Sequence, residues 1–222
     1  MEPHVETEQR ILNAAGEVFA ERGFRDATVR EICARAGANL AAINYHFGDK
    51  AALYGRVLDQ ARCWSDEHDR PILDAAGTPQ DRLELFIRGM LNKLFDKGRP
   101  SWHTRLMSRE MVEPTAAFDG LVDCTIRPKF DLLRGIVADL LGPPAPDPED
   151  DRVILSAASV IGQCLHHHHC RHVTHRLLPG ALDAPDLIPK LTDHILRFSL
   201  AGIAGLRQPG TTGAGRAAGG DR

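Results

Sequence analysis

The feature that most constrains this chain is the stretch TVREICARAGANLAAINYHF at residues 28–47, which predicts two short helices around a tight turn. Thr28 and Glu31 form the S/T-x-x-E pattern, in which a hydroxyl and a carboxylate satisfy free backbone N–H groups at a helix start. Gly37 can end the first helix in a left-handed conformation, and Asn39 can cap the second. The two helices should therefore be short and joined at a fixed angle.

The outer face of the second short helix carries small and hydrogen-bonding side chains. With Leu40 and Ile43 expected to point inward, this face consists of Ala41, Ala42, Asn44, Tyr45 and His46. Groups of this kind suit the edges of base pairs in the DNA major groove. A helix N-terminus offers free N–H groups to a phosphate, so Thr28 and Asp49 mark two positions where a DNA backbone could bind. The alternative is a compact three-helix bundle without nucleic acid, in which Tyr45 and Phe47 simply pack inside.

The rest of the sequence favours an all-α protein, because no stretch shows the period-2 alternation of a strand. The formal net charge is −3, and residues 1–62 hold eight Lys or Arg against nine Asp or Glu. No basic field therefore attracts nucleic acid, and any DNA affinity must come from locally placed groups such as Arg30, Arg35 and Lys50.

Apolar stripes and turn residues predict where the other helices begin and end. Pro128 should kink or split the helix that begins at Pro114. The four prolines of residues 142–151 indicate a loop, and the glycine-rich residues 207–222 indicate a disordered tail. The remaining helices are expected from Thr7 to Gly23, from Asp49 to about His68, from about Thr78 to Lys97, from Ser101, from near Arg152 and from Leu187.

Residues 7–64 resemble the DNA-binding domain of the TetR family of bacterial transcriptional regulators. The segments that match are ILNAAGEVFAERGF, ATVREICARAGA and INYHFGDKAAL, in that order and spacing. The resemblance implies a helix-turn-helix domain at 1–50, reaching to about 66 with the fourth helix, whose helix from about residue 39 to 46 enters the major groove. It assigns DNA contacts to Thr28, Arg30, Asn39, Leu40, Ala41, Ala42, Asn44, Tyr45, His46 and Lys50. Ala41 and Ala42 replace polar groups of many relatives, so contact with thymine methyl groups is one expectation for them.

The segments RLMSREMVEPTAAFDGLVDCTIRPKF and SVIGQCLHHHH resemble the C-terminal domain of the CecR-type, or CerR-type, branch of these regulators. The resemblance covers about residues 80–175. It implies that residues 51–206 form a regulatory domain that dimerises and encloses a small-molecule pocket, whose ligand changes the spacing of the two DNA-binding domains. The lining we expect is Trp102, His103, Met107, Glu110 and Met111. The alternative is that this stripe of methionine and aromatic side chains is ordinary core.

The last two helices carry apolar surface on more than one face. Ser156, Ser159 and Gly162 are small enough to let another helix approach closely. Two such helices from each of two subunits can form a symmetric four-helix interface, so we expect a homodimer.

The segment CLHHHHCRHVTH places Cys164, His168, His172 and His175 at helical spacing. Imidazoles at i and i+4 can bind zinc or another transition metal, which suggests a metal-responsive regulator as an alternative. No carboxylate or CxxC pair completes a ligand set, however. The same histidines can also lie at an interface or interact with the dipole at a helix C-terminus.

The sequence gives no indication of an enzyme, because it lacks GxSxG, HExxH and a glycine-rich phosphate loop. No cofactor is expected. The start of the chain lacks a signal-peptide pattern and no apolar run is long enough for a bilayer, so we expect a cytoplasmic protein with reduced cysteines. The sequence therefore predicts a ligand-responsive repressor that binds a palindromic operator as a dimer. A helical interaction protein without DNA binding is the remaining alternative.

Overall fold

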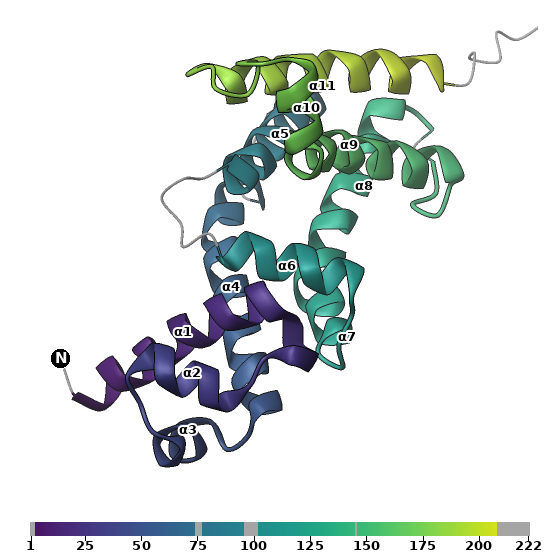
Figure 1. The fold of residues 1–222 in the computed structure, drawn as a ribbon. Helices are drawn as coiled ribbons and strands as arrows, with labels where there is room; N and C mark the ends of the chain where they lie inside the picture. Colours follow the sequence, from purple (N-terminus) through teal and green to yellow (C-terminus); the bar gives the residue numbers. More distant parts are fainter. Residues whose placement is uncertain (1–2, 74–76, 96–101, 145, 208–222) are drawn as a thin grey trace, which may run out of the picture.

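The computed structural model describes residues 3–73, 77–95, 102–144 and 146–207, with only the backbone path for residues 3–5 and 62–73. This part of the chain contains helices and no strand, which confirms the all-α prediction (Figure 1). The elements are α1 (Pro3–Asp26), α2 (Val29–Ala36), α3 (Leu40–Phe47), α4 (Lys50–Leu73), α5 (Pro79–Phe95), α6 (Trp102–Val112), α7 (Phe118–Leu121), the π-helical η1 (Val122–Ile126), α8 (Arg127–Leu141), α9 (Asp151–His169), α10 (Arg171–Leu177) and α11 (Leu187–Gly205).

Two hydrophobic cores divide the molecule. The first contains buried side chains of α1 to α4 together with Trp102 and Leu106 of α6. The second joins α5, α8, α9 and α11. Figure 1 shows α6 lying between α1 and α8, with the long α4 running from the first core towards the second. Helix α6 therefore packs with the N-terminal helices, although α5 precedes it in the chain.

Most of the predicted helix caps are confirmed. The N–H of Ala52 donates to the Asp49 carboxylate over 2.8 Å, and the N–H of Asp81 donates to the Thr78 hydroxyl over 3.2 Å. Helix α1 differs from the prediction at its start, since it begins at Pro3 rather than Thr7. The predicted end at Gly23 is confirmed, because its φ of 80° and ψ of 169° are not helical and separate the helix before it from a short helical segment that follows up to Asp26. A side chain at Gly23 would also collide with the Arg109 guanidinium, 2.5 Å from an added Cβ.

The helix break expected at Pro128 takes the form of η1. Pro128 has no N–H to donate to the carbonyl four residues earlier, which disrupts the α-helical pattern. The N–H of Arg127 instead donates to the Val122 carbonyl, five residues back, as in a π-helix. Helix α8 then starts with Pro128 in its first turn. The proline thus widens the helix locally and does not end it.

A loop connects α8 to α9. The predicted loop at 142–151 is confirmed for its described residues up to Asp150, where α9 is capped by the Asp150 carboxylate. The predicted disordered tail and the Ser101 cap lie outside the described residues, apart from Arg207. Among the described helices, none combines the length and the apolar character needed to cross a membrane.

Candidate nucleic-acid interface and regulatory region

Helices α2 and α3 form the predicted pair around a tight turn. The Thr28 hydroxyl accepts the N–H of Glu31 over 3.2 Å, and the Asn39 side-chain oxygen accepts the N–H of Ala42 over 2.8 Å. Gly37 ends α2 in the left-handed region at φ 60°. Three independent caps therefore fix the start of both helices and the bend between them, which orients α3 on the surface of the first core.

The outward face of α3 presents a mixture of apolar and polar groups. Tyr45 is 79% exposed and Leu40 is 57% exposed. Ala41 and Asn44 are also exposed, whereas Ala42 and His46 are half-buried. Leu40 was expected to point inward and does not, because it is the first residue of α3 and only Ile43 and Phe47 reach the core. The alternative in which both Tyr45 and Phe47 pack inside is confirmed for Phe47, which is buried, and wrong for Tyr45.

The basic side chains of this region have different roles. Arg35 binds both carboxylate oxygens of Glu21 at 2.9 Å, which raises the pKa of the guanidinium and lowers the pKa of the Glu21 carboxyl. It therefore braces α2 against α1, and although Arg35 is exposed, its guanidinium is engaged by Glu21 and would have to exchange that ion pair to reach a phosphate. Arg30 is exposed in the first turn of α2 and forms no ion pair with another described residue.

Lys50 is held by the C-terminal end of α1. Its ammonium donates to the carbonyls of Phe24, Arg25 and Ala27 over 2.8, 3.3 and 3.0 Å. It also lies 4.7 Å from the centre of the Phe24 ring. These three bonds use all three ammonium donors, so a phosphate contact from Lys50 would require exchange of at least one carbonyl.

The residues expected to line a ligand pocket lie mainly in the contact between α6 and the N-terminal helices. Trp102 is fully buried with its ring against Gly16, where an added Cβ would lie 2.5 Å from the indole. His103 is buried and Met107 packs against the first core, whereas Met111 is 50% exposed. Trp102, His103 and Met107 therefore belong to the packing around the first core, as in the alternative interpretation, whereas Met111 does not.

Glu110, the fifth residue of that set, anchors a buried hydrogen-bond network. It accepts the hydroxyl of Tyr54, on α4, in a short hydrogen bond. Its other oxygen accepts both the N–H and the hydroxyl of Thr115 over 2.8 Å. Burial, followed by the bond to Glu110, raises the pKa of Tyr54. The network ties α6 to α4, and sequence analysis missed it because Tyr54 and Glu110 are far apart in the chain.

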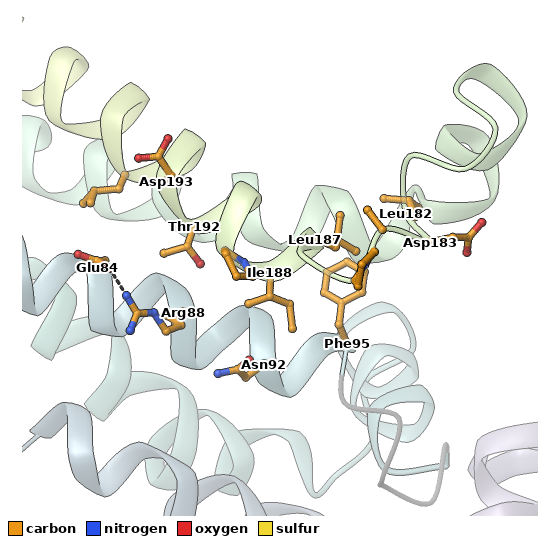
Figure 2. Close-up of a pocket in the computed structure, with 14 residues that line it drawn as sticks. Glu84, Arg88, Asn92, Phe95, Leu182, Asp183, Leu187, Ile188, Thr192 and Asp193 are labelled. Atoms are coloured by element: carbon orange, nitrogen blue, oxygen red, sulfur yellow. Dashed lines mark hydrogen bonds and ion pairs between the residues drawn. The ribbon is translucent and has the colours of Figure 1, made fainter.

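A hollow of about 710 Å³ lies elsewhere, between α5 and residues 182–196 (Figure 2). It is bordered by apolar side chains, by the ion pair of Arg88 with Glu84, and by several carboxylates. Its lining is Glu84, Arg88, Asn92, Phe95, Leu182, Asp183, Ala184, Pro185, Leu187, Ile188, Pro189, Thr192, Asp193 and Leu196. No sequence motif pointed to this site, since it arises where two distant segments pack together.

The histidine segment does not form the predicted metal site. Helix α9 ends at His169 and α10 begins at Arg171, so the break at Cys170 turns His172 and His175 onto a separate helix where both are exposed. Cys164 is fully buried, which raises its pKa to about 12. Among the described residues no three His, Cys, Asp or Glu side chains are placed to hold a metal ion. The expectation that His168, His172 and His175 share a helix face is therefore wrong, and Cys164 is part of the second core.

Helices α9 and α11 share a surface of small and aromatic side chains. Phe198 is 64% exposed, and neither Gly162 nor Gly202 has an atom within 4 Å of an added Cβ. A shallow hollow of about 460 Å³ on this surface is lined by Ser159, Gly162, Gln163, His166, His167, His194 and Phe198. We call this the α9–α11 face.

Comparison with known proteins assigns both parts of the chain to one family. Residues 11–57 match the model for bacterial regulatory proteins of the tetR family. Residues 79–203, more than half of the chain, match the C-terminal domain of the HTH-type transcriptional dual regulator CecR. The chain belongs to the TetR family. Its C-terminal domain is of the CecR type.

One relative is similar in sequence and two solved structures are similar in fold. The HTH-type transcriptional dual regulator CecR of Shigella flexneri is 34% identical over 170 residues, covering 72% of this chain and 74% of that protein. A Clostridium perfringens putative fatty acid metabolism regulator has a similar fold, with a TM-score of 0.68 at 19% identity over 87% of this chain and 97% of that one. AibR, solved with isovaleryl coenzyme A and operator DNA, gives a TM-score of 0.65 at 17% identity over 86% and 97% of the two chains.

Proposed function

We propose that this TetR-family regulator is a ligand-responsive repressor that binds a palindromic operator as a homodimer. The observation that carries the proposal is the capped, outward-facing α3, whose Tyr45 and Leu40 are largely exposed. A short helix held in this way after a tight turn has the geometry with which helix-turn-helix proteins enter the major groove. We assign DNA binding to residues 1–50, extended to about 66 by α4, and regulation and dimerisation to residues 51–206.

We assign the DNA contacts to two groups of residues. Thr28 and Arg30, at the exposed N-terminal turn of α2, would bind phosphate, since free N–H groups and a positive dipole end meet there. On α3, Asn39, Leu40, Ala41, Ala42, Asn44, Tyr45 and His46 would face the groove. Asn44 has an amide that can pair with a base edge, and Leu40 and Ala41 offer apolar contact to thymine methyl groups. Lys50 would contribute mainly by holding the end of α1 in place.

Dimerisation through the α9–α11 face would place two copies of α3 in neighbouring major-groove turns. An effector then releases DNA only if it binds better to the conformation whose spacing does not fit the operator, because affinity alone shifts no equilibrium. AibR was solved with both isovaleryl coenzyme A and operator DNA. That structure supports a small-molecule effector for this chain without identifying it.

The test compares Tyr45→Ala and Asn44→Ala by fluorescence anisotropy with DNA from the upstream promoter of the gene and a set of single-base variants. Loss of a phosphate contact should weaken binding to every sequence alike, as expected for Tyr45→Ala. Loss of a base contact should relax the preference at one position, as expected for Asn44→Ala. Gln80→Ala, on the exposed start of α5, is the control and should bind as the wild type does. Wild-type affinity in both α3 variants would contradict the proposal.

A further inference from the structure

We propose that the hollow between α5 and residues 182–196 binds an amphipathic small molecule whose head group is uncharged or carries one positive charge. The hollow measures about 710 Å³. Small-molecule sites usually enclose roughly 300–1,000 Å³ and combine an apolar lining with a few polar groups. Figure 2 shows the hollow between α5 on one side and the start of α11, with the segment before it, on the other.

The apolar part of the hollow lies towards the end of α5. The Phe95 ring approaches Leu187 and Ile188 of α11, with Leu182 beside them (Figure 2). Phe95 and Ile188 are half-buried and pack against the second core, so this wall is held in place by the protein itself. It suits a hydrocarbon chain or ring, which gains free energy by leaving water.

The polar part is a stripe on α5. Glu84, Arg88 and Asn92 follow at intervals of four residues, so they lie on one face of the helix. Arg88 is bound to Glu84 in a short ion pair. The Asn92 amide is exposed and forms no hydrogen bond with another described residue, which leaves a donor and an acceptor available to a ligand.

The charges of the lining select the head group. Glu84, Asp183 and Asp193 carry negative charge, against the single cation of Arg88. Arg88 is already neutralised by Glu84, whereas the Asp183 carboxylate has one ion-pair contact among the described residues, with the imidazole nitrogen of His175 3.9 Å away. Asp193 is paired with Arg197 over 2.9 Å. With Glu84 and Asp193 each paired to an arginine, Asp183 leaves the lining with a net negative charge, so molecules with several negative charges, such as acyl-coenzyme A, fit this hollow poorly.

The position of the hollow connects it to the rest of the molecule. Helix α5 packs against both α4 and α11. A ligand bound between α5 and α11 would shift α11, which belongs to the α9–α11 face, relative to α4, which follows α3 in the chain. This regulatory consequence rests on the proposed function, whereas ligand binding itself does not.

Three probes with the same chain and different head groups test the inference by isothermal titration calorimetry on the full protein: octyltrimethylammonium, 1-octanol and octanoate. The expected result is that the cation and the alcohol bind about tenfold more tightly than octanoate, because the lining carries a net negative charge at Asp183. Equal affinities for all three probes would overturn the charge argument. Absence of binding by every probe would overturn the site.

Two substitutions locate the binding. Asn92→Trp, at an exposed position, should fill the hollow and abolish binding of all probes, whereas Gln80→Trp on the same helix should not. The double variant E84K/D183K should reverse the preference towards octanoate. Its control E113K/D123K, which makes the same charge change away from the hollow, should leave the preference unchanged. Unaltered binding in Asn92→Trp would show that the probes bind elsewhere and would contradict the proposal.

Promoter binding separates this inference from the proposed function. If the protein binds promoter DNA but none of the probes, the ligand site is refuted and the proposed function as a DNA-binding regulator is not. Probe binding with the predicted preference, but no DNA binding, would support the ligand site and contradict the proposed function.

Discussion

At the residue scale, basic side chains near α2 and α3 divide into those that hold the domain together and those that remain available to DNA. Arg35 and Lys50 are bound internally, to Glu21 and to three carbonyls, whereas Arg30 is exposed. Residue type and spacing alone could not separate them, because the partners of Lys50 belong to a backbone end more than twenty residues away. A charge count therefore overstates the cations that face DNA.

Replacing Lys50 by Ala should reduce stability, because three carbonyls at the end of α1 lose their donor. We expect a decrease of about 1–3 kcal/mol in the free energy of unfolding. Urea unfolding followed by circular dichroism measures it. Arg30→Ala is the control and should keep its stability while weakening DNA binding. A Lys50→Ala protein with unchanged stability would show that the carbonyl contacts contribute nothing.

His168 should make the fold sensitive to mild acid. Burial, aided by Arg171 and His169, lowers its pKa from 6.5 to about 4. Between these values the unfolded chain binds a proton that the folded chain does not, so stability should fall as the pH decreases from 6.5 towards 4. The expected loss is roughly 1 kcal/mol, less than the full shift implies, because the ring is partly exposed.

The measurement is thermal unfolding at pH 7 and pH 5. His168→Gln should lose less stability than the wild type on acidification, whereas His172→Gln, changed at an exposed position of α10, should behave as the wild type does. Identical pH dependence in all three proteins would contradict the assignment to His168.

At the element scale, α6 is attached to the N-terminal helices by a tryptophan stacked on a glycine and by a buried carboxylate. Removing the carboxylate in Glu110→Ala leaves the Tyr54 hydroxyl and the Thr115 N–H without their acceptor. We expect a loss of about 2–4 kcal/mol in the free energy of unfolding. Glu113→Ala, one turn away and exposed, should cost much less. Equal effects of the two substitutions in urea unfolding would refute the structural role of Glu110.

The α9–α11 face should hold two subunits together. Phe198→Arg would place a charge in that interface, so the protein should become monomeric in size-exclusion chromatography with light scattering. Val112→Arg introduces the same charge at an exposed apolar position of α6 and should leave the dimer intact. The monomer should also bind a full operator more weakly, with unchanged affinity for a half-site. A dimeric Phe198→Arg protein would contradict this assignment.

Helix boundaries were predicted well where a local signal exists. Thr28, Asn39, Asp49 and Thr78 all cap helices through hydrogen bonds within a few residues of themselves. Helix boundaries were predicted wrongly where tertiary packing, and not a local sequence signal, determines where a helix ends. The break at Cys170 has no glycine or proline to mark it, so helical periodicity appeared to continue through the histidines.

At the scale of the whole molecule, the chain order conceals how the helices group. The sequence predicted a boundary near residue 50, yet α6 shares the first core with α1 to α4. The hollow beside α5 also depends on a segment about a hundred residues later in the chain. Local patterns specify helices, whereas the pairing of distant apolar faces specifies cores and cavities, and only the former can be read along the sequence.

The central claim is that an almost neutral N-terminal domain binds DNA through a few placed groups. The most direct test is fluorescence anisotropy of the wild-type protein with its upstream promoter DNA at increasing salt. Release of counterions from a dimer making about six phosphate contacts predicts that affinity falls by roughly a thousandfold between about 50 and about 200 mM salt. Absent binding, or binding that does not change with salt, would contradict the account.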